Sequence, residues 1–323
     1  MKKLEKITQL TEQYVKDFNA DVFSLIKSDD DYLNRVLQYI FSDTGKQVRV
    51  HLVYISAKLF GKVTRQTYLA AVLVHLLHTS TLIHDDVVDK AVVRRGKKTV
   101  NAEWNNKVAV LAGDYLFSKA LEIAIEEKMY DVLEILTPTI SQMSMGEIIQ
   151  LKEIEIKRYS EAVYMDIIYR KTAVLISAAA QLGAKTAGAT PIQEIAIQKF
   201  GNEAGMAFQI QDDILDFTAS YSFGKVNGKD LEEKKYTLPL IYALDKAPKK
   251  ESSRIMEAID NGVNKKDKQQ ILEFIDTYKG FDYAQQVMND HVSKAHDILK
   301  TLPKNEANDV LYDLIVYFTE RKK

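Results

Sequence analysis

Two acidic segments, far apart in the chain, share a spacing that suits metal-assisted phosphate chemistry. The first reads D-D-V-V-D over residues 85–89, and the second reads D-D-I-L-D over residues 212–216. On a helix, the first and fifth positions of such a segment lie one turn apart on the same face. Each segment therefore directs several carboxylates into one small volume, where their mutual repulsion is relieved by hard cations such as Mg²⁺. The simplest interpretation is a pair of motifs that hold a diphosphate through bridging Mg²⁺.

The ordinary explanation of an acidic cluster is a solvated helix face, and the flanking residues argue against it here. The residues before the first motif (81–84) and before the second (207–210) do not resemble exposed charged faces. Two copies with equal spacing, both at the end of apolar helical runs, are hard to explain as surface decoration.

Cationic side chains accompany the acidic motifs. Arg94 and Arg95 follow the first motif, and the guanidinium fork matches phosphate oxygens, which predicts a second anion beside the metal-bound one. Lys46 and Arg49 share a face at the start of a predicted helix, where backbone N–H groups also attract anions. Taken alone, this second pair could equally be solvated.

For two further residues and one loop, a functional interpretation again competes with an ordinary structural one. Lys171 interrupts a strongly apolar helical pattern, so it either extends to solvent or meets a buried anion. A single histidine is usually structural, but His78 lies two turns before Asp85 on nearly the same helix face. The loop over 220–229 carries glycine and lysine and is a plausible lid.

Composition limits the class of protein. The chain has 323 residues, a formal net charge of −1, 46% apolar residues and no cysteine. The charge favours neither nucleic acid nor acidic membranes as partners, and the missing cysteines exclude disulfides and thiolate chemistry. We expect no signal peptide, no transmembrane helix and a cytoplasmic location, with at most peripheral membrane contact during product release.

Periodicity predicts an all-α protein with one domain over 1–323. Prolines number five, none before Pro138, and apolar residues recur at spacings of three and four. No convincing strand pattern and no domain linker are found. Besides two helices within 1–42, we expect helices over about 46–60, 65–90, 108–127, 138–156, 160–182, 198–217 and 305–320, with residues 245–270 as exposed turns and short helices.

From residue 45 to the C-terminal helix, the sequence resembles the trans-isoprenyl diphosphate synthases, especially the medium- to long-chain polyprenyl diphosphate synthases that make quinone side chains. The resemblance rests on the blocks over 82–89 with 94–96 and over 201–216. It implies a single bundle of long antiparallel helices around a central cavity, the isoprenoid synthase fold, with the two motifs facing each other. It also implies head-to-tail condensation of an allylic diphosphate with successive isopentenyl diphosphates, by ionisation, condensation and elimination.

The resemblance assigns roles to single residues. Those that match metal ligands are Asp85, Asp86, Asp89, Asp212 and Asp216, and the implied cofactor is Mg²⁺. Arg94, Lys171, Lys225 and Lys235 match cations that hold the allylic diphosphate, and Thr172 and Gln209 match positions beside the developing carbocation. Lys46, Arg49, His78 and Arg95 match the site for isopentenyl diphosphate.

The chain departs from the family pattern near that last site. Gln47 stands where relatives have arginine, His75 stands where many have glutamate, and the segment over 233–235 lacks the usual glycine. These changes bear on the positioning of isopentenyl diphosphate and leave the reaction class in place.

Product length is predicted from the residues one and two turns before the first motif, which are Ser80, Thr81 and Leu77. In the family, a large aromatic residue five positions before the motif stops elongation early. Ser80 is small, so we expect a product of about hexa- to octaprenyl length.

Several alternatives remain open. The chain could be a shorter farnesyl or geranylgeranyl synthase, or the catalytic half of a two-component synthase with a small partner subunit in place of the homodimer that the resemblance implies. A terpene cyclase would replace the second motif with a different metal triad. A non-catalytic helical metal-binding protein would not account for the cations around the motifs.

Overall fold

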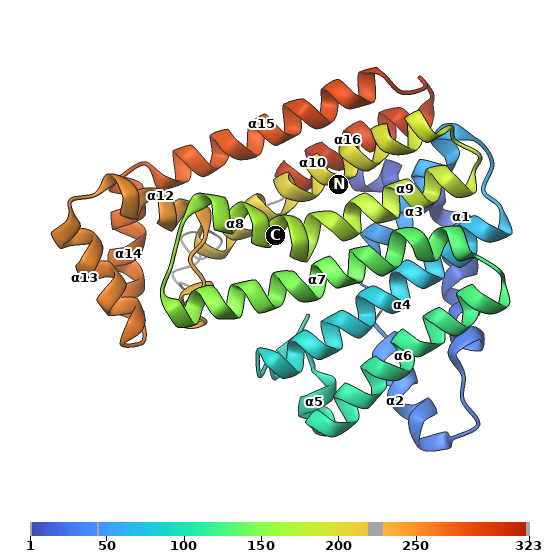
Figure 1. Ribbon diagram of the computed structural model, residues 1–323, viewed down its shortest axis with the longest axis horizontal. Helices are drawn as coiled ribbons and strands as arrows, with labels where there is room; N and C mark the ends of the chain where they lie inside the picture. Colours follow the sequence, from blue (N-terminus) through green and yellow to red (C-terminus); the bar gives the residue numbers. More distant parts are fainter. Residues whose placement is uncertain (1, 44, 219–228, 321–323) are drawn as a thin grey trace. The chain divides into compact units, whose positions relative to one another are not determined.

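The computed structural model describes residues 2–43, 45–218 and 229–320 (Figure 1). Within these ranges the chain forms helices and one short hairpin, so the all-α prediction is confirmed. The helices are α1 (Lys2–Ile26), α2 (Asp31–Phe41), α3 (Val48–Phe60), α4 (Arg65–Val88), α5 (Val100–Glu103), α6 (Asn106–Glu126), α7 (Tyr130–Ile156), α8 (Glu161–Ile168), the π-helical turn η1 (Tyr169–Ala173), α9 (Val174–Thr186), α10 (Pro191–Thr218), α11 (Lys229–Glu232), α12 (Leu238–Lys246), α13 (Lys249–Asp260), α14 (Lys265–Thr277), α15 (Gly280–Lys300) and α16 (Glu306–Glu320).

The chain divides into two compact units. Unit 1 comprises Met1–Ile140, Ala178–Ile195 and Pro303–Val310, and unit 2 comprises the remaining segments. Helices α7, α9, α10 and α16 each continue from one unit into the other. The expectation of one domain over 1–323 stays a prediction.

Unit 1 is organised around α4, which packs against α3 and α6 (Figure 1). The side chains from Leu69 to Val74 are almost completely buried. By length and mean hydropathy α4 could span a membrane, although the sequence led us to expect no such helix. Its apolar side chains are instead buried in the core of unit 1, and this burial accounts for its composition.

Capping side chains fix where the helices of unit 1 begin. Thr64 accepts a hydrogen bond from the backbone N–H of Thr67 and takes part in a reciprocal capping box. Asn105 likewise caps α6 by accepting from the N–H of Val108. With its start fixed at Arg65, α4 ends at Val88, which places the first acidic motif in its last turn.

Unit 2 contains a core in which α12, α14 and α15 pack together and α12 contacts α8. Figure 1 shows α15 as one long helix leaving the group formed by α12, α13 and α14. The buried apolar residues of this core come from α8, α10 and α12–α15, and Ile210, Phe217, Leu240 and Ile275 are fully enclosed. This core supports the part of α10 that carries the second acidic motif.

Three predictions about elements were wrong in detail. Helix α7 begins at Tyr130 rather than near Pro138, and the proline is accommodated inside the helix. A short antiparallel hairpin, β1 (Val93–Arg94) with β2 (Lys97–Lys98), occupies a segment where we expected no strands. The predicted helix over 160–182 continues to Thr186 and contains the π-helical turn η1.

The turn η1 is packed between two glycines of unit 2. Its closing bond runs from the N–H of Val174 to the carbonyl of Tyr169, one residue wider than an α-helical bond. A Cβ atom at Gly205 of α10 would lie 2.5 Å from the Cα of Ala173, and one at Gly146 of α7 would lie 2.8 Å from the Cβ of Arg170. Both neighbouring helices therefore need glycine at these positions to approach the turn.

We predict that Gly205→Ala lowers the free energy of unfolding by about 1–3 kcal/mol, because the added methyl group overlaps the backbone of η1. Alanine normally stabilises a helix relative to glycine by about 1 kcal/mol, so the sign of the effect is diagnostic. Urea unfolding of both proteins measures it. Lys199→Ala, at an exposed position of the same helix, is the control and should change stability by less than about 0.5 kcal/mol. A stabilised Gly205→Ala variant would contradict this packing.

Candidate active site

The first acidic motif lies at the C-terminal end of α4 in unit 1. Asp85 and Asp86 belong to the last turn, and Asp89 is the C-cap residue. Backbone carbonyls at a helix C-terminus carry partial negative charge, which adds to the attraction for cations. Asp86 is 6% exposed, and its Oδ1 accepts hydrogen bonds from Nε of Arg94 at 2.9 Å and from Nη2 at 2.8 Å. One predicted diphosphate-binding cation is thus already beside the motif.

The hairpin β1–β2 positions both arginines that follow the first motif. Its turn residues Arg95 and Gly96 have φ angles of 53° and 77°, as a tight two-residue hairpin requires. Arg94 reaches back to Asp86, whereas the guanidinium of Arg95 lies against Gly45, where any side chain would collide with it. Arg95 is thereby brought to the loop before α3, the segment that carries Lys46 and Arg49.

Two of the predicted isopentenyl diphosphate residues, Arg49 and His78, meet at the start of α3. Nη1 of Arg49 donates to Nε2 of His78 at 2.9 Å. Burial lowers the pKa of His78 well below 6.5, and the positive charge of Arg49 lowers it further, so the imidazole is neutral at physiological pH. Its Nδ1 then carries the hydrogen, and this buried atom finds no hydrogen-bond partner within the described ranges. It is a donor suited to an anionic ligand.

Gln47, one of the departures from the family pattern, has a structural role in unit 1. It is the N-cap of α3 with a left-handed backbone, φ 43°. Its side-chain amide exchanges hydrogen bonds with Asn19 of α1, at 2.7 Å in one direction and 3.2 Å in the other. The first helix of the chain thus holds the loop between Lys46 and Arg49.

The predicted chain-length residues line α4 behind the first motif. Ser80 is 1% exposed, and its hydroxyl donates to the carbonyl of Gly113 on α6 at 2.9 Å. Leu77 is also buried, and the Thr81 hydroxyl donates to the carbonyl of His78. Ser80 therefore packs directly on the backbone of α6, which makes α6 part of the surface that surrounds this position.

The second acidic motif lies near the end of α10 in unit 2. Asp212 and Asp216 are partly accessible and one turn apart, whereas Asp213 between them is 5% exposed. The backbone N–H of Asp230, on α11, donates to Oδ2 of Asp216 at 3.2 Å. The three aspartates of the motif thus have different environments despite sharing one helix.

Asp213 is held by two hydrogen bonds inside unit 2. The hydroxyl of Tyr164 donates to its Oδ2 at 2.7 Å, and Nε2 of Gln209 donates to its Oδ1 at 2.8 Å. Burial raises the pKa of Asp213 well above its usual range and the charge of Asp230 raises it further, while these two hydrogen bonds oppose the shift. Oε1 of Gln209 in turn accepts from the hydroxyl of Thr172 at 2.7 Å.

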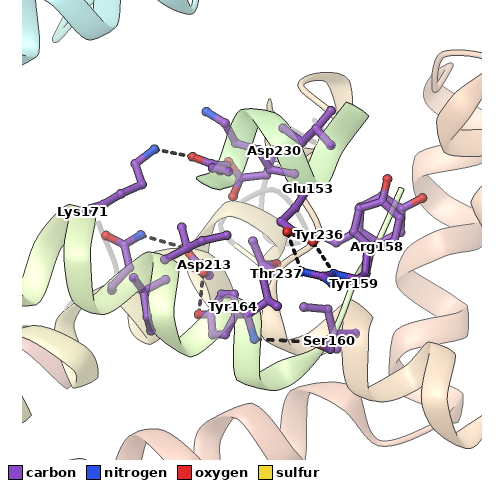
Figure 2. A pocket seen from close by; sticks show the side chains of 18 of the residues that line it. Glu153, Arg158, Tyr159, Ser160, Tyr164, Lys171, Asp213, Asp230, Tyr236 and Thr237 are labelled. Carbon is purple, nitrogen blue, oxygen red and sulfur yellow. Dashed lines mark hydrogen bonds and ion pairs between the residues drawn. The ribbon is translucent and has the colours of Figure 1, made fainter. Parts of the chain in front are cut away.

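A cavity of about 230 Å³ adjoins this chain of hydrogen bonds (Figure 2). Lys171 lies on one side of it and the Glu153–Arg158 ion pair on another, while Asp213 and Tyr164 point toward each other in its wall. Lys171 contacts Glu147 at 2.7 Å and Lys235 contacts Glu233 at 2.5 Å, so both lysines are partly neutralised. Apolar lining comes from Ile154, Val163, Ile167, Ile168 and Ile241.

Within each unit, several of the predicted residues converge. Unit 1 brings Arg94 to Asp86, Arg49 to His78 and Arg95 to Gly45, and unit 2 brings Thr172, Gln209, Lys171 and Lys235 to one cavity. Lys225 lies outside the described residues. That the two motifs face one diphosphate concerns both units and stays a prediction.

Sequence reasoning missed Tyr164, Glu147 and Asp230, and it gave Asp213 no role. A tyrosine on an amphipathic helix carries no signal of its own, and Asp213 was indistinguishable from its neighbours in the motif. The position of Glu147 beside Gly146 was visible in the sequence, but its contact with Lys171 depends on the packing of α7 against η1.

The carboxylates of both motifs fit a hard divalent cation by their chemistry. All donors are oxygens, and Asp85 with Asp89 and Asp212 with Asp216 are each spaced by one helical turn. Among the described residues, no three acidic or imidazole groups converge closely enough to form a complete metal site by themselves. This suits a cation that takes much of its coordination from substrate phosphate and water.

Comparison with known proteins defines the class. The family model of polyprenyl synthetases matches residues 30–275, and the chain belongs to this family. It is 34% identical to the octaprenyl diphosphate synthase of Escherichia coli (strain K12), over 99% of each chain. It is 35% identical to the heptaprenyl diphosphate synthase component 2 of Geobacillus stearothermophilus, over 92% of each chain.

The fold agrees with solved members. The crystal structure of a polyprenyl synthase from Caulobacter crescentus CB15, complexed with calcium and isoprenyl diphosphate, matches with a TM-score of 0.91 and 31% identity over 99% of this chain and 98% of that one. The protein is therefore a prenyltransferase with the all-α isoprenoid synthase fold, and its family depends on divalent metal.

Proposed function

We propose that the protein condenses an allylic diphosphate with successive isopentenyl diphosphates to an all-trans polyprenyl diphosphate of medium to long chain, used for quinone side chains. The observation that carries the proposal is the cavity in unit 2, where Lys171 and Lys235 accompany the hydrogen-bonded pair Thr172–Gln209 beside the second acidic motif. Family membership and the similarity to octaprenyl and heptaprenyl synthases support the reaction and the length class.

The cationic side chains provide the driving force for ionisation. Lys171 and Lys235 of unit 2 stabilise negative charge on the departing diphosphate as the allylic C–O bond breaks, and the family resemblance predicts the same role for Arg94. Their acidic partners hold them in place beforehand, so little reorganisation is needed when the charge develops. Lys225 is predicted to join them.

Mg²⁺ is the cation we propose, since oxygen ligands and phosphate are its usual partners. The residues that would hold it are Asp85, Asp86 and Asp89 at the first motif and Asp212 and Asp216 at the second. When bound, it neutralises the charge that builds on the leaving diphosphate.

The oxygens of Thr172 and Gln209 flank the allylic carbocation, and the apolar lining from Ile154, Ile168 and Ile241 keeps water from it. Lys46, Arg49, His78 and Arg95 hold isopentenyl diphosphate by its own phosphate groups. Its double bond attacks the cation, and the released diphosphate accepts the proton that is then lost.

Product analysis tests this function. We predict that the purified protein, given farnesyl diphosphate, isopentenyl diphosphate and Mg²⁺, forms a ladder of prenyl products ending near hexa- to octaprenyl. Removing divalent metal with EDTA should abolish product, and restoring Mg²⁺ should recover it. A wild-type protein that stops at farnesyl or geranylgeranyl length would contradict the length class. A protein that gains activity after addition of a small subunit captured from the native cell would instead identify a two-component synthase, as the relative called component 2 suggests.

We predict that Ser80→Phe shortens the final product by several isoprene units. Because the backbone of α6 lies against Ser80, a phenyl ring must occupy space along α4, where the prenyl chain is predicted to run. Chromatography of the hydrolysed products measures the change. Ser80→Ala, which removes the hydroxyl without adding bulk, is the matched control and should leave the length unaltered. If Ser80→Phe makes a product of wild-type length, the predicted path along α4 is wrong.

We propose that the protein acts as a homodimer in the cytoplasm and that α7 supplies part of the interface. Met145, Ile148, Leu151 and Ile156 are 47%, 60%, 51% and 50% exposed on α7, and the first three recur at a spacing of three residues. Exposed apolar residues that recur along one helix are typical of an interface.

Light scattering should give the molar mass of a dimer for the wild-type protein and of a monomer for Ile148→Lys. Ile192→Lys, at an 81% exposed isoleucine outside α7, is the control and should remain dimeric. Equal molar masses for the wild type and Ile148→Lys would place the interface elsewhere.

A further inference from the structure

The middle aspartate of the second motif stands apart from its neighbours. Asp213 is 5% exposed, and its two carboxylate oxygens accept hydrogen bonds, one from Tyr164 (Figure 2) and the other from Gln209. Tyr164 itself is 5% exposed, so the contact is enclosed by protein. An aspartate with both oxygens occupied in this way is placed to orient its partners.

The direction of these hydrogen bonds follows from which groups donate and which accept. In the structure Nε2 of Gln209 donates to Oδ1 of Asp213, which places the NH₂ side of the amide toward the carboxyl group. The carbonyl oxygen of Gln209 then faces Thr172, and the hydroxyl of Thr172 must donate its single hydrogen to that oxygen. The lone pairs of Thr172 are left for the cavity that Thr172 and Gln209 line.

We propose that Asp213 is a positioning residue, which fixes the amide orientation of Gln209 and through it presents the oxygen lone pairs of Thr172 toward the developing allylic carbocation. The inference rests on the proposed function, since it requires a cation at Thr172. A hydroxyl that offered its hydrogen to that cation would destabilise it, so the direction of the chain determines the sign of its electrostatic effect.

The surrounding structure holds this arrangement in place. Thr172 lies in the π-helical turn η1, which Gly146 and Gly205 pack from two sides, and Gln209 and Asp213 are one turn apart on α10. Tyr164 on α8 fixes the other oxygen of Asp213. Asp213 therefore acts on the reaction through Gln209 and Thr172, without contact with the reacting atoms.

Asp213→Asn tests the proposal because asparagine has the same shape but can donate. Its NH₂ group allows the Gln209 amide to turn over, so that Thr172 must accept a hydrogen bond and point its own hydrogen at the cavity. We expect kcat to fall by about tenfold or more, while KM for both substrates and the Mg²⁺ concentration for half-maximal rate change by less than about threefold. Lys199→Ala, at an exposed position of α10 outside this chain of hydrogen bonds, is the control and should retain kcat within about threefold.

A double-mutant cycle with Thr172→Val separates this role from a general one. If Asp213 acts through the hydroxyl of Thr172, Asp213→Asn should cost less than about threefold once that hydroxyl is absent, but its full effect in a Thr172→Ser background. Gln209→Leu breaks the same chain one link later, so its cost should be smaller in the Thr172→Val background than in the wild type, and the remainder measures the contribution of the Gln209 oxygen itself. That variant carries the test if Asp213→Asn fails to fold, which a circular dichroism melt would reveal.

Three results would overturn the proposal. They are a wild-type kcat in Asp213→Asn, losses that multiply in the cycle, and a loss of rate that excess Mg²⁺ restores, which would make Asp213 a metal ligand. Failure of the proposed function looks different, because the wild-type protein would then make no polyprenyl product at all and Thr172 would face no cation.

Discussion

Each acidic motif has a buried aspartate whose charge must be compensated by neighbouring groups, and the structure around both motifs depends on this constraint. An ionised side chain taken out of water is costly unless another group meets it. Asp86 is buried at the end of α4 and has Arg94, and Asp213 is buried on α10 and has Tyr164 and Gln209. The local architecture follows from this need, since the β1–β2 hairpin returns Arg94 to α4 and the start of α8 carries Tyr164 to α10.

The two units compensate these charges in different ways. In unit 1 the compensating groups are cations on loops and helix ends, such as Arg94 and Arg49. Burial and these charges keep His75 and His78 neutral, and the pKa of His75 falls to about 4. In unit 2 the lysines are matched by Glu147 and Glu233, and neutral hydrogen bonds hold the buried carboxylate. Unit 1 is thus suited to bind an anion that keeps its charge during the reaction, whereas unit 2 is suited to stabilise charge that develops during the reaction.

Much of this could be predicted from sequence because it depends on local rules. The spacing of the aspartates placed them on helix faces, and the apolar periodicity indicated the fold class. What could not be predicted depends on contacts between distant segments. Pro138 was read as a helix start, although α7 begins at Tyr130 and continues through it. The link between Asn19 and Gln47 joins residues 28 positions apart, and no local pattern marks it. Asp213 looked like its neighbours until burial separated it from them.

The π-helical turn η1 has a consequence for how the site could arise and be lost. A turn with i→i+5 bonding holds one residue more than the α-helical turn it replaces, so α8 and α9 differ in rotational register by about 100° across it. Removing one residue between Tyr169 and Ala173 would restore a regular helix and turn Thr172 away from Gln209, while the remainder of α9 kept its packing. The direction in which Thr172 points therefore depends on the number of residues in η1. A single-residue insertion or deletion there would rotate this part of the site, which a substitution would not do.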